Sequence, residues 1–193
     1  MSNHAPGSSL LVSGLIGYCR AGFEKELAAE IDDIAADAGL IGYVRAQPDT
    51  GYVVYETFEP VALASLGEAT DWRRPVFARQ LLPWFGRVDD LPERDRATPI
   101  VDAVKATGQR FCGVVLETPD TDVAKQQSGF CRRFTEPLSR ALEKASALRT
   151  SRTGLPVLHV LFTDASTAWL AAEMPGQAAP WPMGVPRLRM PSN

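Results

Sequence analysis

The chain has 193 residues, which allows one large domain or two small ones. Its composition, 45% hydrophobic and 22% charged, is ordinary for a folded soluble protein. The formal net charge of −3 gives no overall sign of a nucleic-acid binder, so any basic surface must come from the way charge is distributed.

Residues 10–87 predict the order β-α-β-β-α-β, which is the ferredoxin-like pattern. Leu27 and Ile31 recur at helical spacing, and Gly39 ends that helix. The turn at 48–51, Pro-Asp-Thr-Gly, separates two strands, because proline fixes φ and glycine accepts a positive φ. The predicted elements are strand Leu10–Tyr18, helix Phe23–Ala38, strands Leu40–Ala46 and Tyr52–Phe58, short helix Val61–Leu66 and strand Val76–Phe85.

A charged linker with a proline, residues 88–98, is predicted to separate this unit from a second one at 99–193. Pro137 is expected to interrupt a long helical stretch because it lacks an amide donor, and Thr135 would then cap a new helix. The predicted elements are helix Ile100–Thr107, strand Phe111–Glu117, helices Ala124–Phe134 and Glu136–Leu148, and strands Val157–Thr163, Ala168–Met174 and Met183–Met190. The order is α-β-α-β-β-β, and the fold class predicted for the whole chain is α/β (α+β).

Neither a metal nor a membrane is expected as a partner. Cys19, Cys112 and Cys131 are odd in number and form no Cys-x-x-Cys pair, so they favour buried, reduced thiols in a cytoplasmic protein. The apolar run at 10–18 is too short to span a membrane, and no basic segment precedes it as in a signal peptide. Residues 1–9 are rich in Ser, Gly, Pro and Asn, and they predict a disordered leader.

Charge is distributed unevenly along the chain. Residues 1–60 carry three Lys or Arg against nine Asp or Glu, and residues 122–152 carry seven against three. The local net charges of −6 and +4 indicate an acidic half that supports the structure and a basic half that contacts a partner. Two differently solvated surfaces would account for the same asymmetry.

A basic stripe is predicted on the helix that follows Thr135. Arg140 and Lys144 are four residues apart and share a flank, which Arg133 extends. Such a stripe can neutralise successive phosphates without reading sequence. The alternative is a solvated helix face that carries Glu136 and Glu143 among its cations.

No familiar catalytic signature is present, since GxGxxG, Walker A, GxSxG and HExxH motifs are all missing. One of the two histidines, His4, lies in the leader. His159 shares a strand face with Val157 and Leu161, which favours a core histidine over a catalytic base. Accordingly, no catalytic residue is assigned.

Seven segments, in order along nearly the whole chain, carry a resemblance to a known family. They are 19–26 (CRAGFEKE), 51–56 (GYVVYE), 77–80 (FARQ), 95–100 (DRATPI), 130–138 (FCRRFTEPL), 159–162 (HVLF) and 183–189 (MGVPRLR). Together they resemble the N-terminal region of the RlmM family, bacterial cytidine 2′-O-ribose methyltransferases of large-subunit (23S) ribosomal RNA.

The resemblance implies a ferredoxin-like subdomain followed by a THUMP domain, an RNA-binding module of RNA-modifying enzymes. It also implies a following Rossmann-like methyltransferase domain with a glycine-rich S-adenosylmethionine loop and a Lys-Asp-Lys-Glu catalytic set, and this chain contains none of those positions. We therefore expect no cofactor in this chain, S-adenosylmethionine in the parent enzyme, and ribosomal RNA and the missing domain as partners.

On this reading the chain binds and positions RNA for the catalytic domain. The predicted RNA contacts are Arg132, Arg133, Arg140, Lys144, Arg149 and Arg152, with Arg187 and Arg189 as weaker candidates. A second hypothesis is a module that docks on the catalytic domain or on another protein and has little RNA contact of its own. A third, a small enzyme that acts alone, is disfavoured by the missing motifs.

Overall fold

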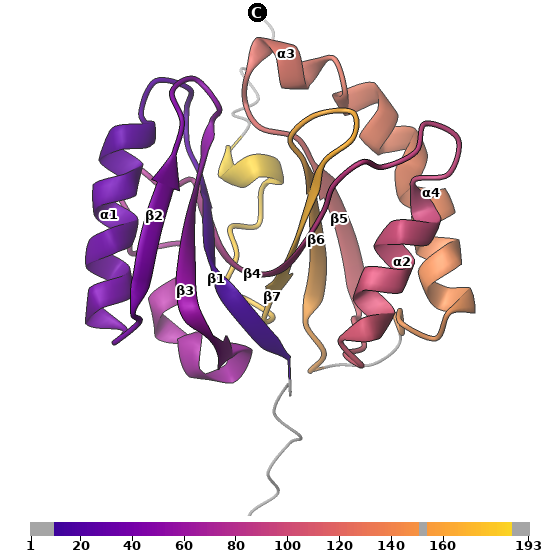
Figure 1. Cartoon of the computed structure of the whole chain (residues 1–193), viewed down its shortest axis with the longest axis horizontal. Coiled ribbons are helices and arrows are strands. Elements are labelled where there is room, and N and C mark those ends of the chain that lie inside the picture. Colours follow the sequence, from indigo (N-terminus) through magenta and orange to yellow (C-terminus); the bar gives the residue numbers. More distant parts are fainter. Residues whose placement is uncertain (1–9, 151–153, 187–193) are drawn as a thin grey trace, which may run out of the picture.

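The computed structural model describes residues 10–150 and 154–186. Within these residues the chain forms a mixed α/β fold, with one seven-stranded sheet in the order β2-β3-β1-β4-β7-β6-β5 and four α-helices (Figure 1). The predicted leader, residues 1–9, lies outside the described part of the chain.

The first unit has the ferredoxin-like strand order that the sequence predicts. Its elements are β1 (Leu11–Tyr18), α1 (Glu24–Asp37), β2 (Gly42–Ala46), β3 (Tyr52–Ala62) and β4 (Gln80–Val88). The strands lie in the order β2-β3-β1-β4, and each pair of neighbours is antiparallel. The predicted helix at Val61–Leu66 is wrong in its first two residues, because Val61 and Ala62 pair with β1. Two short 3-10 turns, Leu63–Leu66 and Glu68–Thr70, follow.

The second unit contains a parallel strand pair and a hairpin. Its elements are α2 (Ala97–Ala106), β5 (Gly113–Glu117), α3 (Asp122–Lys125), α4 (Ser128–Lys144), β6 (Val157–Phe162) and β7 (Ala168–Glu173). The helices α3 and α4 connect β5 to its parallel neighbour β6, and β7 returns antiparallel to β6.

The predicted last strand, Met183–Met190, is wrong over its described residues. Pro182–Gly184 form a 3-10 turn, and Met183 has a left-handed backbone with φ of 57°. The Met183 amide donates to the buried Glu117 carboxylate at 2.8 Å instead of joining a strand ladder. Residues 187–190 lie outside the described part of the chain.

One sheet continues across both units. Strand β4 pairs with β1 on one side, and from Trp84 to Val88 it pairs with β7 on the other. The chain therefore does not form two units with a sheet each, which is what the two element orders suggest. The reason is that β1 pairs with only one edge of β4, so the other edge is free to pair with β7. A domain boundary at 88–98 stays a prediction.

Pro137 does not break the helix, contrary to the sequence-based prediction. Helix α4 runs unbroken from Ser128 to Lys144 with Pro137 inside it. Pro137 is exposed, so the Arg133 carbonyl that it leaves without a helical donor lies on the wet side of the helix. The Thr135 hydroxyl donates to the Cys131 carbonyl at 2.8 Å, and the Ser139 hydroxyl donates to the Thr135 carbonyl at 2.7 Å. These bonds support the turn around the proline.

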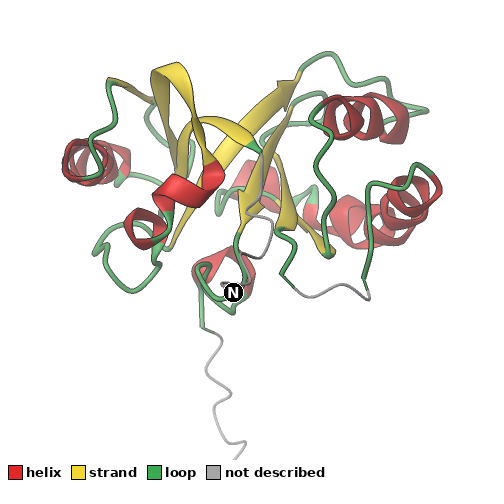
Figure 2. Cartoon of the chain, turned by 90° about the horizontal axis from the view of Figure 1, so that it is seen from below, coloured by secondary structure: helices red, strands yellow, loops and turns green. Residues whose placement is uncertain are grey.

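The sheet buries different side chains on its two faces. The larger core lies between the sheet and the helices and includes Leu27, Leu138 and Phe162. The opposite face carries a smaller cluster around Trp84 and Trp169, whose rings meet edge to face at 5.0 Å. Seen from below, the sheet is strongly bent, with α1 outside one arm and α2 and α4 outside the other (Figure 2). Among residues 10–150 and 154–186, no α-helix covers the inner side of the bend, where Ala178 and Met183 pack instead.

Candidate nucleic-acid interface

Three exposed cations lie on one side of α4, and we call them the α4 strip: Arg133, Arg140 and Lys144. They are seven and four residues apart, which places them on one side of the helix. Arg132, also exposed, lies on a neighbouring side. Arg140 pairs with Glu136 one turn earlier, but both side chains are more than 70% exposed. Such an exposed pair is weak, so Arg140 can exchange Glu136 for another anion such as a phosphate.

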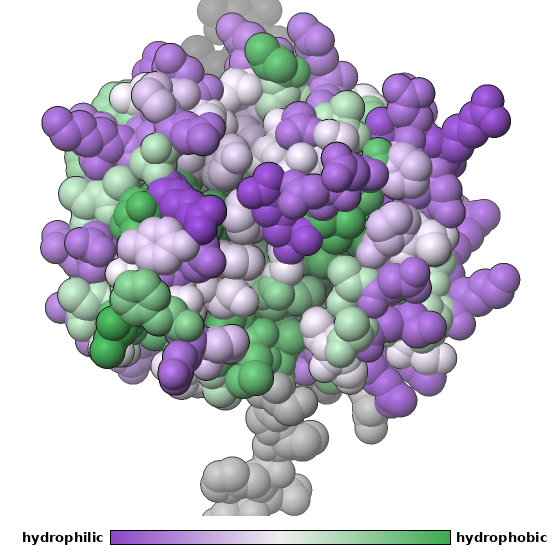
Figure 3. Space-filling model, in the orientation of Figure 1, coloured by the Kyte–Doolittle hydropathy of each residue, from purple (hydrophilic) through white to green (hydrophobic). Residues whose placement is uncertain are grey.

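The buried side of α4 fixes the direction of the strip. Cys131, Leu138 and Leu142 are buried against the core, and the helix contacts β5 and α2. Phe130 and Phe134 stack at 4.9 Å and both meet Phe162. Phe130 and Phe134 are partly buried and pack against the core. Hydrophilic side chains dominate the right-hand side of the molecule over α2 and α4 (Figure 3).

A second basic site lies just beyond the end of α4. Phe111 and Leu148 form an isolated parallel bridge, and the Arg149 amide donates to the Phe111 carbonyl at 2.7 Å. Arg110 immediately precedes Phe111 and Arg149, a predicted contact residue, immediately follows Leu148, so the two exposed arginines flank this bridge. The prediction missed Arg110 because it lies far from the basic segment in sequence. Arg152, Arg187 and Arg189 lie outside the described residues.

His159 is buried, as its strand face predicts, and it lies between two carboxylates. Its Nδ1 is 3.3 Å from Glu117 Oε2, and its Nε2 is 2.9 Å from Glu173 Oε2. Burial lowers the pKa of His159, but hydrogen bonds to the two carboxylates outweigh it and raise the pKa to about 9. The His159 cluster (His159, Glu117 and Glu173) therefore joins the three strands β5, β6 and β7 as a buried ionic contact.

The described residues offer no metal-binding group of three or more His, Cys, Asp or Glu side chains. Across residues 10–150 and 154–186, no helix combines the length and the apolar character needed to cross a membrane. Cys19, Cys112 and Cys131 are all unpaired thiols, and burial is the main reason that the pKa of Cys19 rises to about 12.

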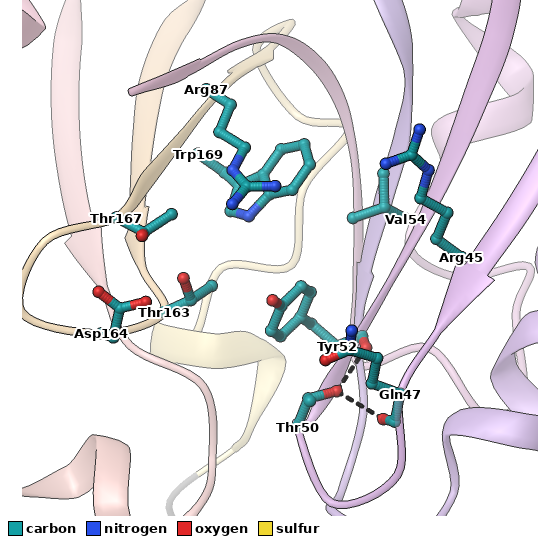
Figure 4. Close-up of a pocket in the computed structure, with 10 residues that line it drawn as sticks. All are labelled: Arg45, Gln47, Thr50, Tyr52, Val54, Arg87, Thr163, Asp164, Thr167 and Trp169. Carbon is teal, nitrogen blue, oxygen red and sulfur yellow. Dashed lines mark hydrogen bonds between the residues drawn. The ribbon is translucent and has the colours of Figure 1, made fainter. Parts of the chain in front are cut away.

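A cleft that sequence reasoning missed lies between the two units on the inner side of the bent sheet. We call it the inter-unit cleft, and its volume is about 290 Å³. The lining residues are Arg45, Gln47, Thr50, Tyr52 and Val54 from the first unit and Arg87, Thr163, Asp164, Thr167 and Trp169 around β4, β6 and β7 (Figure 4). Because these segments are distant in sequence, no local pattern could have joined them.

The fold and its surfaces define a class of α/β protein in which a ferredoxin-like unit and a second unit share one sheet and present a basic outer helix. Comparison with protein families then gives two matches. The RlmM ferredoxin-like domain matches residues 12–82, and the N-terminal domain of ribosomal RNA large subunit methyltransferase M matches residues 95–173. The chain belongs to this methyltransferase M family, in its N-terminal part.

Curated relatives support the same family. Ribosomal RNA large subunit methyltransferase M of Thauera aminoaromatica is 78% identical over the whole chain, and that of Azoarcus sp. (strain BH72) is 73% identical. The chain spans 53% of the length of each relative. Among solved structures, TrmN from Thermus thermophilus is 15% identical, with a TM-score of 0.49 over 85% of this chain and 46% of that chain. This last likeness is too low to bear on function.

Proposed function

We propose that this chain is the RNA-binding region of a methyltransferase that acts on large-subunit ribosomal RNA. The exposed α4 strip is the observation that carries the proposal, because its cations are held on one side of a rigid, well-packed helix. The family supports it, since the relatives are ribosomal RNA methyltransferases by name. In the whole cytoplasmic enzyme, a separate domain would bind S-adenosylmethionine and transfer the methyl group.

The second unit would act as a THUMP-like module that positions RNA. Arginine and lysine along one side of a helix can contact phosphates of one RNA strand, which orients the RNA backbone without selecting its sequence. Arg110 and Arg149 extend this surface beyond the end of the helix. The order of events is then simple: phosphate contacts hold the RNA, and the catalytic domain reaches the ribose that it modifies.

The test is a salt titration of RNA binding with the triple variant R133Q/R140Q/K144Q. With four phosphate contacts, the slope of log affinity against log salt should be roughly −3 to −4, from about 0.7–0.9 per contact. The triple variant should flatten that slope by roughly 2, because three of the contacts are lost. Fluorescence anisotropy with a structured fragment of large-subunit ribosomal RNA measures both quantities.

The matched control is R20Q/K25Q/R94Q, which removes three exposed cations elsewhere on the described surface. It changes net charge by the same amount and should keep most of the wild-type slope. Equal slopes for the wild-type chain and the α4 triple variant would exclude the α4 strip as the RNA-binding surface. That result would favour the docking hypothesis, in which this region binds mainly the catalytic domain.

A second prediction concerns the cofactor. The chain lacks the glycine-rich loop that cradles S-adenosylmethionine in the family that it resembles. Isothermal titration calorimetry of the chain with S-adenosylmethionine should therefore give only heats of dilution. A one-to-one isotherm in the micromolar range would show that this region contributes a cofactor site of its own.

A further inference from the structure

We propose that the inter-unit cleft binds a single unpaired nucleotide of the RNA, with its phosphate at the arginine rim and its base against the Arg87 guanidinium. The inference rests on the proposed RNA-binding function and adds a second, distinct contact to it. The cleft and the α4 strip lie on different parts of the molecule, so the two contacts can succeed or fail separately.

The size of the cleft sets the class of ligand. Its volume of about 290 Å³ lies near the lower end of the roughly 300–1,000 Å³ that is usual for small-molecule sites. One nucleotide matches this size, whereas a base-paired helix is far too wide to enter. Proteins that recognise RNA by its bases act mainly on unpaired nucleotides, which can be stacked on aromatic rings or arginine planes.

Arg87 supplies a planar surface that is already oriented. Its guanidinium lies over the Trp169 ring at 5.2 Å, and the ring is itself fixed by an edge-to-face contact with Trp84. Figure 4 shows the guanidinium in front of the indole, inside the cleft. A base that stacks on the outer side of Arg87 would extend this column without reordering a flexible side chain.

The two arginines also suit a phosphate. Arg87 is bound to Asp89 at 2.8 Å and Arg45 to Glu56 at 2.7 Å, but both arginine side chains remain about half exposed. Exposed pairs of this kind contribute little, so a phosphate can replace or share the carboxylate. Each guanidinium has five N–H donors, which is more than these carboxylates use.

A weakly paired donor lies behind the inner wall of the cleft. Trp169 is 7% exposed, and its indole Nε1–H makes no hydrogen bond of normal geometry; its polar interaction is with the Tyr52 side chain. A buried donor that is poorly paired costs free energy, so an acceptor that reaches it stabilises the complex. Tyr52 also interacts with the Thr163 side chain at this wall (Figure 4), so a carbonyl oxygen of a base would reach the indole by displacing Tyr52.

Asp164 gives the cleft an ionised acceptor. Burial raises the pKa of Asp164, but hydrogen bonds from the Ser166 amide and hydroxyl outweigh burial and lower it, so the carboxylate stays charged. A charged carboxylate repels phosphate and accepts from hydroxyl groups. It therefore favours a nucleotide with the phosphate toward Arg45 and the ribose hydroxyls toward Asp164, which predicts tighter binding of RNA than of DNA.

The test follows the Trp169 indole N–H resonance by NMR in the full 193-residue chain. The resonance is assigned by its loss in W169F, or by backbone-linked assignment if that variant does not fold. A single-stranded pentauridylate should shift this resonance and saturate, and deoxyuridine pentamers and an RNA duplex of equal concentration should shift it much less. R87Q should weaken pentamer binding roughly tenfold, as expected when the stacking surface for one base, worth about 1–3 kcal/mol, is lost. The control R94Q removes an exposed arginine outside the cleft and should not.

The outcomes separate the cleft from the α4 strip. If the α4 triple variant binds RNA weakly yet still shows the Trp169 shift at higher pentamer concentration, both contacts are supported. An unmoved Trp169 resonance at concentrations where anisotropy shows saturated pentamer binding overturns the cleft and leaves the α4 strip standing. Equal shifts with duplex and single strand also overturn it, because a duplex cannot enter. No RNA binding by the wild-type chain at low salt rejects both.

Discussion

Replacing His159 with glutamine should lower the melting temperature by roughly 6–20 °C. The substitution removes the cation between Glu117 and Glu173, whose side chains are only 4% and 16% exposed. Removing one partner of a buried ion pair lowers the free energy of unfolding by about 3–5 kcal/mol, because the remaining charge is then buried without a partner. For a chain of about this size, each kcal/mol lowers the melting temperature by roughly 2–4 °C. Differential scanning calorimetry at pH 6.5 measures the effect.

The same cluster gives stability a defined pH dependence. The pKa of His159 is raised to about 9 in the folded protein, so its contribution is complete below the ordinary value of 6.5 and is lost as pH rises through 9. The pKa of Glu117 is lowered, although burial opposes this, chiefly by its bond to His159. Its contribution is therefore complete above the ordinary value of 4.5 and is lost as pH falls further. Wild-type stability should fall from pH 7 to pH 10, and H159Q should show a smaller fall.

The control for this prediction is the double variant E117Q/H159Q, which replaces two of the three charged groups with uncharged polar ones. It should be more stable than H159Q, because the buried Glu117 charge is then removed together with its partner. A melting temperature for H159Q within 1 °C of wild type would show that the His159 cluster does not carry a net ionic contact.

Replacing Gly14 with alanine should destabilise the protein by roughly 2–5 kcal/mol, the sum of backbone strain and a close contact in the core. Gly14 has φ of 147°, and an added Cβ would lie 1.9 Å from the Tyr55 carbonyl oxygen. That oxygen accepts a hydrogen bond from Trp84 Nε1 at 3.0 Å, so moving it also disturbs the apolar face opposite the helices. Urea denaturation followed by circular dichroism gives the free energy of unfolding.

Gly86 provides a matched control in the same sheet. A Cβ at Gly86 would meet only the Leu170 side chain, at 3.5 Å, which is an ordinary contact. G86A should therefore change the free energy of unfolding by less than about 1 kcal/mol. Equal losses in G14A and G86A would mean that the close approach at Gly14 relaxes without cost and that the proposed strain is absent.

Sequence pattern predicted the elements best where local signals agree. Helix α1 was predicted within one residue at each end, because its apolar spacing and Gly39 act over a few residues. Pro137 was misjudged because a propensity argument could not see that the proline faces solvent, with Thr135 and Ser139 bonding to the backbone around it. The strand at Met183 was wrong because Glu117, distant in sequence, holds the Met183 amide.

Some candidate contact residues could be placed from sequence spacing, whereas others are brought together only by the fold. Arg133, Arg140 and Lys144 could be placed on one stripe because helical spacing is a property of consecutive residues. Arg110 could not, since only the bridge between Phe111 and Leu148 joins its segment to the one that carries Arg149. The cleft residues Tyr52 and Trp169 belong to strands that sequence alone predicted correctly but could not place near each other.

The sequence by itself determined the family resemblance, the ferredoxin-like order of the first unit and the basic stripe, because each follows from local segments and their order along the chain. Only the tertiary structure decided that β4 joins both units in one sheet, that His159 lies between two carboxylates, and that a polar cleft opens between the units. The physical reason is that alternating apolar residues specify a strand but not its neighbour, since strand pairing is a long-range contact.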